Sequence, residues 1–312
     1  MTKSKTARVC ILAMVMSVAA TGEAIAQSPA TAYDFHQSYH IGFDSPEAWG
    51  LKYFASASLL SGLQPPDVQG ESRRTGAITI SLEAGWIPSL DAGQERIGFG
   101  GTTPEDLNKA PAFVRPVVRM TLPWKLTALV AAPPPLTAFG LTPHLVAFGL
   151  ERPIYETPQW RVGWRGYGQV GSAKGAFTCP KDVLAFAPGS AQNPTECVGL
   201  SADIATLRYA GMEFQLARHL NRLPKLVPHV AIGGNFIAGV FQVHAPIVEG
   251  LDETRLWTHG GTVSVTGGAS YLVSKQIAFT VDVFYSPLWV QRSRVVNDGL
   301  LNVRALVSYR IR

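Results

Sequence analysis

Apolar and polar residues alternate along most of this chain. In Ala77–Trp86, which reads AITISLEAGW, every second residue from Ile78 onward is apolar, and the residues between are small or polar. A period of two indicates a β-strand whose two faces meet unlike environments. Either one face packs on a core and the other meets water, or one meets lipid and the other a polar lumen.

The same alternation predicts further strands elsewhere in the chain. The clear segments are 33–43, 77–86, 114–122, 160–169, 210–216, 229–240, 262–271, 277–285 and 301–311, and weaker ones lie near 50–61, 125–133 and 142–151. This gives about twelve strands, with ten and fourteen as alternatives. Their length is that which a tilted strand needs to cross a bilayer.

The links between these strands alternate in length. Counted back from the C-terminus, 291–299, 244–258 and 172–203 are long, whereas 273–276, 219–225 and 152–158 are short. The link at Trp124 and Lys125 is very short, and we expect 62–75 to be a longer turn on the same side. Long outer loops and short periplasmic turns are typical of outer-membrane barrels.

Composition supports lipid as the partner of the apolar face. The chain is 46% hydrophobic and only 16% charged, with a mean hydropathy of +0.12. Beyond the N-terminus, however, no apolar run approaches the ~18 residues of a membrane-spanning helix, and prolines 133–135 interrupt the richest segment, 126–141. Apolar residues spread over alternate positions are what a transmembrane barrel requires. The net charge of +5 and the absence of an arginine-rich run give no sign of a nucleic-acid partner.

The N-terminus has the features of a cleaved export signal. Lys3, Lys5 and Arg8 precede the short apolar run Val9–Ala20, and an A-x-A site ends at Ala26. We therefore expect residues 1–26 to be a signal peptide and 27–312 to be one barrel domain. Cys10 would leave with the signal, so Cys179 and Cys197 are predicted to form a disulfide after export.

By these features, residues 33–312 resemble the Gram-negative outer-membrane β-barrel proteins. The resemblance implies an all-β fold, a single transmembrane antiparallel up-and-down barrel, located in the bacterial outer membrane. Its implied partners are outer-membrane lipid and the barrel-assembly machinery. Such proteins usually end in an aromatic residue that this machinery reads, and the nearest one here is Tyr309.

Sequence motifs for catalysis are weak. The chain has no G-x-S-x-G, and we predict no catalytic residue, no metal site and no cofactor, which makes an enzyme the less favoured class. The glycine-rich stretch 97–102 lacks the Gly-Lys-Ser/Thr ending of a phosphate-binding loop. We expect Thr103 to cap a short helix with Pro104 at its first position, within an ordered outer loop.

The polar rows suggest what the lumen contains. The predicted lumen-facing residues are Lys52, Glu83, Arg115, Arg119, Arg161, Arg165, Glu213, Asp282, Arg304 and Arg310. Their basic excess would favour small anionic solutes. Alternatively, arginine–carboxylate pairs fill a narrow barrel. The predicted function is a passive channel or narrow transporter for small anions. The alternatives are a structural or adhesive barrel with a plugged lumen, and an outer-membrane lipid hydrolase.

Overall fold

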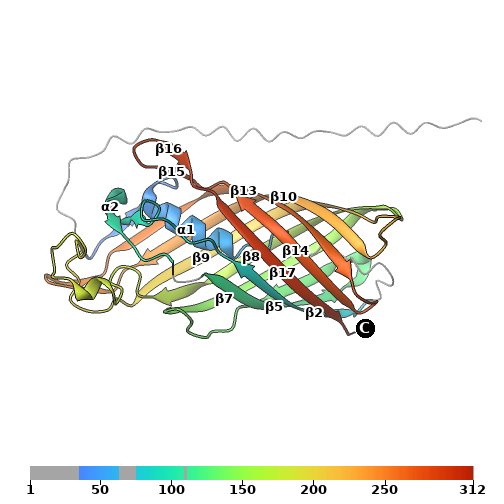
Figure 1. Cartoon of the computed structure of the whole chain (residues 1–312), viewed down its shortest axis with the longest axis horizontal. Helices are drawn as coiled ribbons and strands as arrows, with labels where there is room; N and C mark the ends of the chain where they lie inside the picture. The colour runs from blue at the N-terminus through green and yellow to red at the C-terminus, as the bar shows by residue number, and fades with distance from the viewer. Residues whose placement is uncertain (1–34, 63–74, 109–110, 312) are drawn as a thin grey trace, which may run out of the picture. The chain divides into compact units, whose positions relative to one another are not determined.

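A computed structural model describes residues 35–62, 75–108 and 111–311, so the predicted signal peptide lies outside the described residues. Ten strands form a closed antiparallel barrel, in which pairing of β13 with β14 closes the ring (Figure 1). In spatial order these strands are β2 (Ile78–Trp86), β5 (Ala112–Thr121), β6 (Thr127–Ala131), β7 (Leu141–Glu156), β8 (Trp160–Gly175), β9 (Asp203–Arg218), β10 (Leu226–Gln242), β13 (Arg255–Leu272), β14 (Ile277–Ser286) and β17 (Leu300–Arg310).

The all-β barrel is confirmed, and among the described residues its wall has ten strands, which is the lower of the two alternatives to the predicted number of about twelve. Ten of the twelve predicted segments are wall strands, and the other two are 33–43 and 50–61. In the described part of the first, residues 35–43, the one strand is β1 (Ser38–His40), which pairs in parallel with the start of β13 outside the ring. The second contains most of the helix α1 (Pro46–Ala57).

Alternation along the wall strands separates the outside from the lumen. On β2, Ile80 and Leu82 are 45% and 54% exposed, whereas Ser81 and Glu83 are 2% and 0% exposed. The apolar row therefore faces outward and the polar row inward, which is the arrangement that a barrel in lipid requires. This settles the faces of the segment AITISLEAGW.

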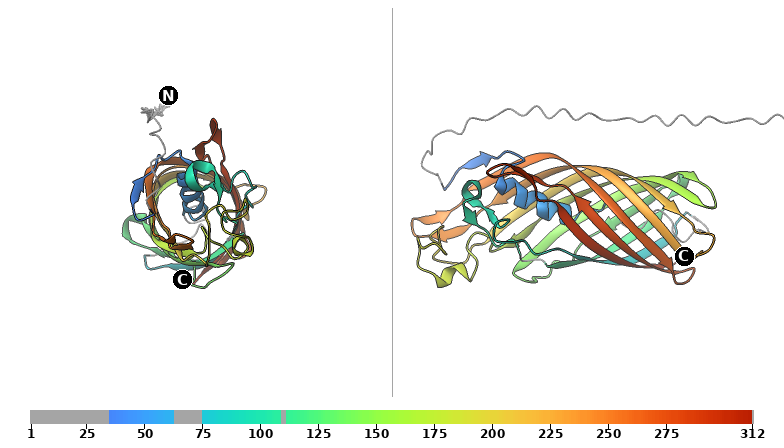
Figure 2. Two further views of the ribbon diagram at one scale, coloured as in Figure 1. Left: turned by 90° about the vertical axis from the view of Figure 1, so that its left-hand side faces the viewer. Right: turned by 45° about the horizontal axis from the view of Figure 1, so that its top comes forward.

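Helix α1 lies inside the ring of strands (Figure 2). Ser45 caps the helix by accepting a hydrogen bond from the backbone N–H of Ala48 at 3.3 Å, and Pro46 occupies the first turn. The carboxylate of Glu47 interacts favourably with the partial positive charge of the helix N-terminus. The helix is buried on almost every side, so its sequence carries no amphipathic period that would distinguish it from a strand. Among the described residues, no helix is long and apolar enough to span a membrane.

The chain enters the barrel from the end that carries the long links. There Ile41 donates its N–H to the carbonyl of Trp257, near the start of β13. At the other end, Gly76 donates to the carbonyl of Thr121, just before the short link between β5 and β6. The predicted turn 62–75 therefore begins within the lumen, at Gly62, and its residues 63–74 lie outside the described ones.

Small elements fill the long links. They are β3 (Arg96–Ile97), α2 (Gly98–Gly101), β4 (Thr103–Pro104), η2 (Val183–Ala185), β11 (Ala245–Ile247), β12 (Gly250–Asp252), β15 (Trp289–Gln291) and β16 (Val295–Asn297), while η1 (Pro123–Lys125) lies in a short link. The predicted helix after Thr103 is wrong, because Thr103 and Pro104 form β4 and the helical turn precedes them. Gly100 and Gly101 supply the positive φ angles of that turn.

Candidate functional site

Three lumen arginines surround the C-terminal end of α1. Arg115 donates to the carbonyls of Ser58 and Leu59 at 2.6 and 3.2 Å, and Arg165 donates to that of Leu60 at 3.1 Å. Arg304 donates to the carbonyls of Leu59 and Ser61 at 2.8 and 2.9 Å. These carbonyls belong to the C-cap residue of α1, Ser58, and to the three residues that follow it, where the negative end of the helix dipole also favours a cation. The arginines therefore anchor α1 and the residues that follow it within the barrel.

Buried carboxylates balance these arginines. Glu83 pairs with Arg115 at 2.5 Å, and Arg165 bridges Glu151 and Glu213 at 2.7 and 3.0 Å. Glu213 also accepts hydrogen bonds from the segment after α1, from the Ser61 hydroxyl at 2.6 Å and the Gly62 N–H at 2.9 Å. We call this set (Glu83, Arg115, Glu151, Arg165, Glu213 and Arg304) the lumen network.

Strand register brings most of the network together. Glu83 is the cross-strand partner of Arg115, and Arg165 is flanked in register by Glu151 on β7 and Glu213 on β9. Directly opposed side chains on one face lie close enough to pair. Glu151 was missed by the sequence prediction, although it follows Ala147 and Gly149 in the inward row of β7.

Arg119 interacts electrostatically with Glu151, Arg165 and Glu83 of the network. Lys52, Arg161 and Arg310 have partners elsewhere. Lys52 is on α1, where its ammonium donates to the carbonyl of Trp289, and burial lowers its pKa to about 8 against the opposing effect of Asp44. Arg161 pairs with Glu156 at 3.2 Å near a short link. Arg119 is buried in the inward row of β5, and the backbone N–H of Arg310 binds the carbonyl of Gln276.

Asp282 has a histidine partner that the sequence prediction did not include. Its Oδ1 lies 2.6 Å from Nε2 of His229, and Gly268 stands between them on β13, where a side chain would overlap Asp282. Nδ1 of His229 lies 3.4 Å from the carbonyl oxygen of Val227. The second ring nitrogen thus faces backbone rather than a nucleophile, so this pair does not form a hydrolase triad.

The barrel wall is incomplete between β5 and β7. The short strand β6 pairs only with Val117–Thr121 of β5 and with Ala147–Glu151 of β7. Beyond it, within the described ranges, no strand separates Ala112–Pro116 from Leu141–Val146. One residue after β6 come prolines 133–135, which cannot donate to a sheet and so prevent the strand from continuing.

A cavity of about 360 Å³ occupies this break and is called the portal cavity. From the lumen side it is lined by Phe54, Ala57 and Ser58 around the end of α1. From the outer side it is lined by Val114 and Leu136, which are 47% and 69% exposed. The portal cavity therefore runs from the lumen through the wall, and its size falls in the usual range for small-molecule sites.

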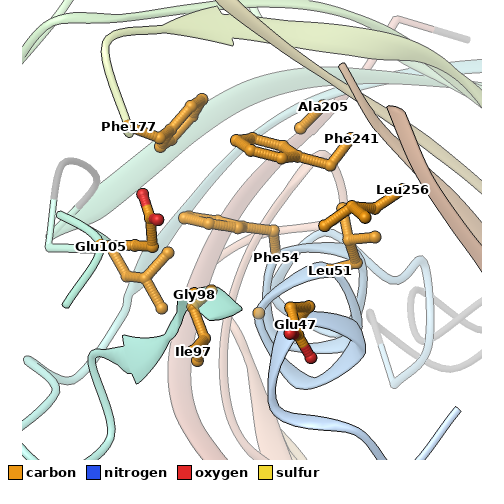
Figure 3. Close-up of a pocket in the computed structure, with 12 residues that line it drawn as sticks. Glu47, Leu51, Phe54, Ile97, Gly98, Glu105, Phe177, Ala205, Phe241 and Leu256 are labelled. Carbon is orange, nitrogen blue, oxygen red and sulfur yellow. The ribbon is translucent and has the colours of Figure 1, made fainter. Parts of the chain in front are cut away.

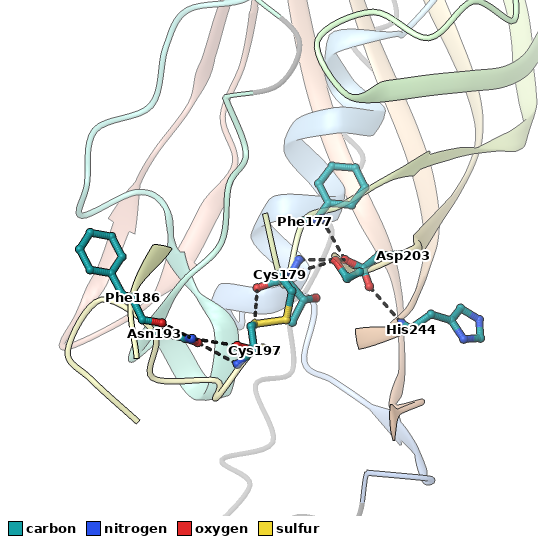
Figure 4. The surroundings of a disulfide bond; sticks show 9 residues. Phe177, Cys179, Phe186, Asn193, Cys197, Asp203 and His244 are labelled. Carbon is teal, nitrogen blue, oxygen red and sulfur yellow. Dashed lines mark hydrogen bonds between the residues drawn. A yellow bond between two sulfur atoms is a disulfide. The ribbon is translucent and has the colours of Figure 1, made fainter. Parts of the chain in front are cut away.

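A disulfide constrains the loop that contributes Phe177 to the lining of this cavity. Cys179 and Cys197 are bonded as predicted, in the long link between β8 and β9 (Figure 4). Asp203 at the start of β9 accepts the N–H groups of Phe177 and Thr178 at 2.9 and 2.8 Å. These constraints hold the Phe177 ring against Phe54 of α1, with ring centroids 5.8 Å apart.

A second, smaller cavity is also lined by these two rings (Figure 3). It has a volume of about 50 Å³, and we call it the outer cavity. Phe54, Phe177 and Ala205 line both cavities. Glu105 also lines the outer cavity, and neither alternation nor a motif marks this residue in the sequence.

The ring of ten strands, with apolar rows outside and polar rows inside, defines a transmembrane β-barrel class of protein. No protein-family model and no curated protein sequence matches the chain. Among solved structures it is similar to the outer membrane protease OmpT from Escherichia coli (10% identity, 76% of this chain and 94% of that one, TM-score 0.38). It is also similar to Ail, the attachment invasion locus protein of Yersinia pestis (11%, 76% and 100%, 0.29), and to the Pseudomonas putida toluene transporter TodX (11%, 81% and 73%, 0.35). The predicted resemblance in architecture is confirmed by the closed ring of antiparallel strands itself.

Proposed function

We propose that the protein is a bacterial outer-membrane transporter for small apolar molecules, which leave the lumen sideways through the portal cavity. The observation that carries this proposal is the cavity itself. Its lining joins buried residues at the end of α1 to Val114, which belongs to the outward apolar row. A molecule that passes between them would move from the lumen to lipid without crossing the lumen network.

The straight route through the barrel is obstructed. Helix α1 lies inside the ring (Figure 2), and the network arginines bind the carbonyls of residues 58–61, which directly follow it. Arg115 and Arg165 also pair with buried glutamates. The positive charges of the paired arginines are largely neutralised by their partners, so they attract a mobile anion only weakly. This arrangement favours a narrow transporter over an anion-selective channel. The solute that we propose is therefore apolar rather than anionic.

The structural or adhesive alternative also accommodates a plugged lumen, but it has no use for a cavity that crosses the wall. Apolar lining residues such as Phe113, Leu136 and Leu145 are the kind that bind uncharged ligands. A barrel that served only as a scaffold would gain stability by filling this space. The wall break therefore favours transport.

Uptake of a dye tests the proposal. N-phenyl-1-naphthylamine fluoresces when it enters lipid, so its entry rate can be compared between cells with and without the protein at equal growth. We expect faster entry with the protein, together with no ion conductance of the purified protein in planar bilayers. Equal entry rates would refute apolar transport, and a steady anion-selective current would restore the channel interpretation.

A further inference from the structure

Glu105 presents an unpaired carboxyl oxygen in a largely apolar cavity. The residue is 8% exposed, and its Oε2 atom has no hydrogen-bond partner among the described residues. Phe54, Phe177 and Phe241 line the same cavity, and Figure 3 shows the carboxyl group of Glu105 beside the first two rings. A buried carboxyl without a partner is costly for the fold, so its retention calls for an explanation.

The surroundings of Glu105 are negative. Burial raises its pKa well above the usual range, and the negative charges of Asp203, Asp252, Glu47 and Asp106 raise it further. Asp203 lies on β9, Asp252 on β12, Glu47 on α1 and Asp106 on the same link as Glu105. The same negative electrostatic potential that opposes ionisation of Glu105 attracts a positive charge to this position.

The backbone also places the carboxyl group precisely. The other oxygen, Oε1, lies against Gly98, where a Cβ atom would approach it to 2.6 Å. The amide of Glu105 donates to the carbonyl of Glu95 at 2.9 Å and ties β4 to the preceding turn. Glu105 therefore faces the cavity from a fixed position rather than from a free loop.

We infer that the outer cavity is a binding site for a small organic amine, whose apolar part contacts Phe54 and Phe177. The amine binds as the ammonium ion, paired with the carboxylate of Glu105, after Glu105 has given its proton to the amine or to water. A charge-assisted hydrogen bond between an ammonium group and a carboxylate is roughly twice as strong as a neutral one. Aromatic rings add attraction for an ammonium group. The volume of about 50 Å³ suits only a few heavy atoms, since one water needs roughly 10–15 Å³ by this measure.

This inference goes beyond the proposed function, because binding at the outer cavity does not require passage through the portal cavity. Since Phe54 and Phe177 line both cavities, however, an occupied outer cavity would lie at the entrance to the portal cavity. A binding measurement on the purified protein therefore tests the site independently of transport. Failure of dye uptake would leave the binding result untouched.

The test compares tert-butylammonium with tert-butanol, which have the same shape and differ in charge. Calorimetric titration of the full-length barrel in detergent should give a dissociation constant for the amine at least about tenfold lower than for the alcohol. Glu105→Gln should abolish this preference, whereas Glu95→Gln, which removes a charge from the same link outside the cavity, should retain it. Heat-modifiable mobility on unboiled gels checks that each variant is folded.

Three results would overturn the inference. Equal affinity for the two compounds would show that charge is not recognised, and absence of amine binding would show that the cavity is not a site. If Glu105→Gln and Glu95→Gln reduced the preference for the amine equally, the preference would come from the overall negative charge of the link and not from Glu105. A further variant, Gly98→Ala, should weaken amine binding without removing any charge, because it displaces Oε1 of Glu105.

Discussion

Phe54 of α1 and Phe177 of the link between β8 and β9 pack with their ring centroids 5.8 Å apart. Both rings line the outer cavity and the portal cavity. One ring is fixed by α1, which the arginines hold, and the other by Cys179 and Asp203. Two elements that are distant in sequence thus meet where the two cavities share their lining.

Removal of one of these rings should open the path. We expect Phe177→Ala to raise the rate of dye uptake several-fold, because the truncated side chain joins the two cavities. Phe186→Ala provides the control, since Phe186 lies in the same link but is exposed and lines neither cavity. Equal rates for wild type and Phe177→Ala would mean that the ring contact is not the barrier.

Reduction of the disulfide should have a related effect. The bond restrains the loop by about 3 kcal/mol on chain-entropy grounds, and Phe177 lies two residues from Cys179. Cells that produce the Cys179→Ser, Cys197→Ser double variant should therefore take up dye faster than wild type. Thiol quantification supplies the check on the bond itself: the unreduced, denatured mature protein should contain no reactive thiol.

The lumen network should dominate stability. Arg165→Gln leaves Glu151 and Glu213 buried without their cation, so the free energy of unfolding in urea should fall by about 3–5 kcal/mol. Arg161→Gln is the matched control because its partner Glu156 is partly exposed, and its cost should stay below about 1 kcal/mol. A similar small loss for both variants would contradict a structural role for the network.

Protonation of Glu105 should make its link sensitive to pH. Its raised pKa means that the folded protein keeps a proton that the opened link releases above the usual value of 4.5. This contribution to stability is complete below pH 4.5 and is lost as pH rises through the folded pKa. Amide exchange of 103–106, corrected for intrinsic rates, should therefore show more frequent opening at pH 8 than at pH 5. Glu105→Gln should remove this difference, and a difference that persists in the variant would assign it to another group.

Much of the barrel could be predicted from the sequence, because alternation reports directly on two unlike faces. The inward positions of Glu83, Arg115 and Arg165 follow from it. Their pairing depends on register between strands, which a single strand does not encode. Helix α1 could not be predicted in this way, since a helix enclosed by a barrel is buried all round and loses its period.

The portal and outer cavities were harder to predict. Prolines 133–135 appear in the sequence as an interruption of an apolar segment, but the width of the resulting break depends on where β7 begins. Glu105 comes to face the cavity only because β3 and α2 pack against α1, and β4 pairs with β3. Neither relationship leaves a local pattern.

Exit of apolar molecules through the wall is tested most directly by filling the portal cavity from within the barrel. Ala173 on β8 is buried and lines this cavity, whereas Val170 on the same strand is 51% exposed on the outer face. Dye uptake should be lost in cells that produce folded Ala173→Trp and retained in cells that produce Val170→Trp. Undiminished uptake with Ala173→Trp would contradict the claim that apolar molecules leave the barrel through its wall.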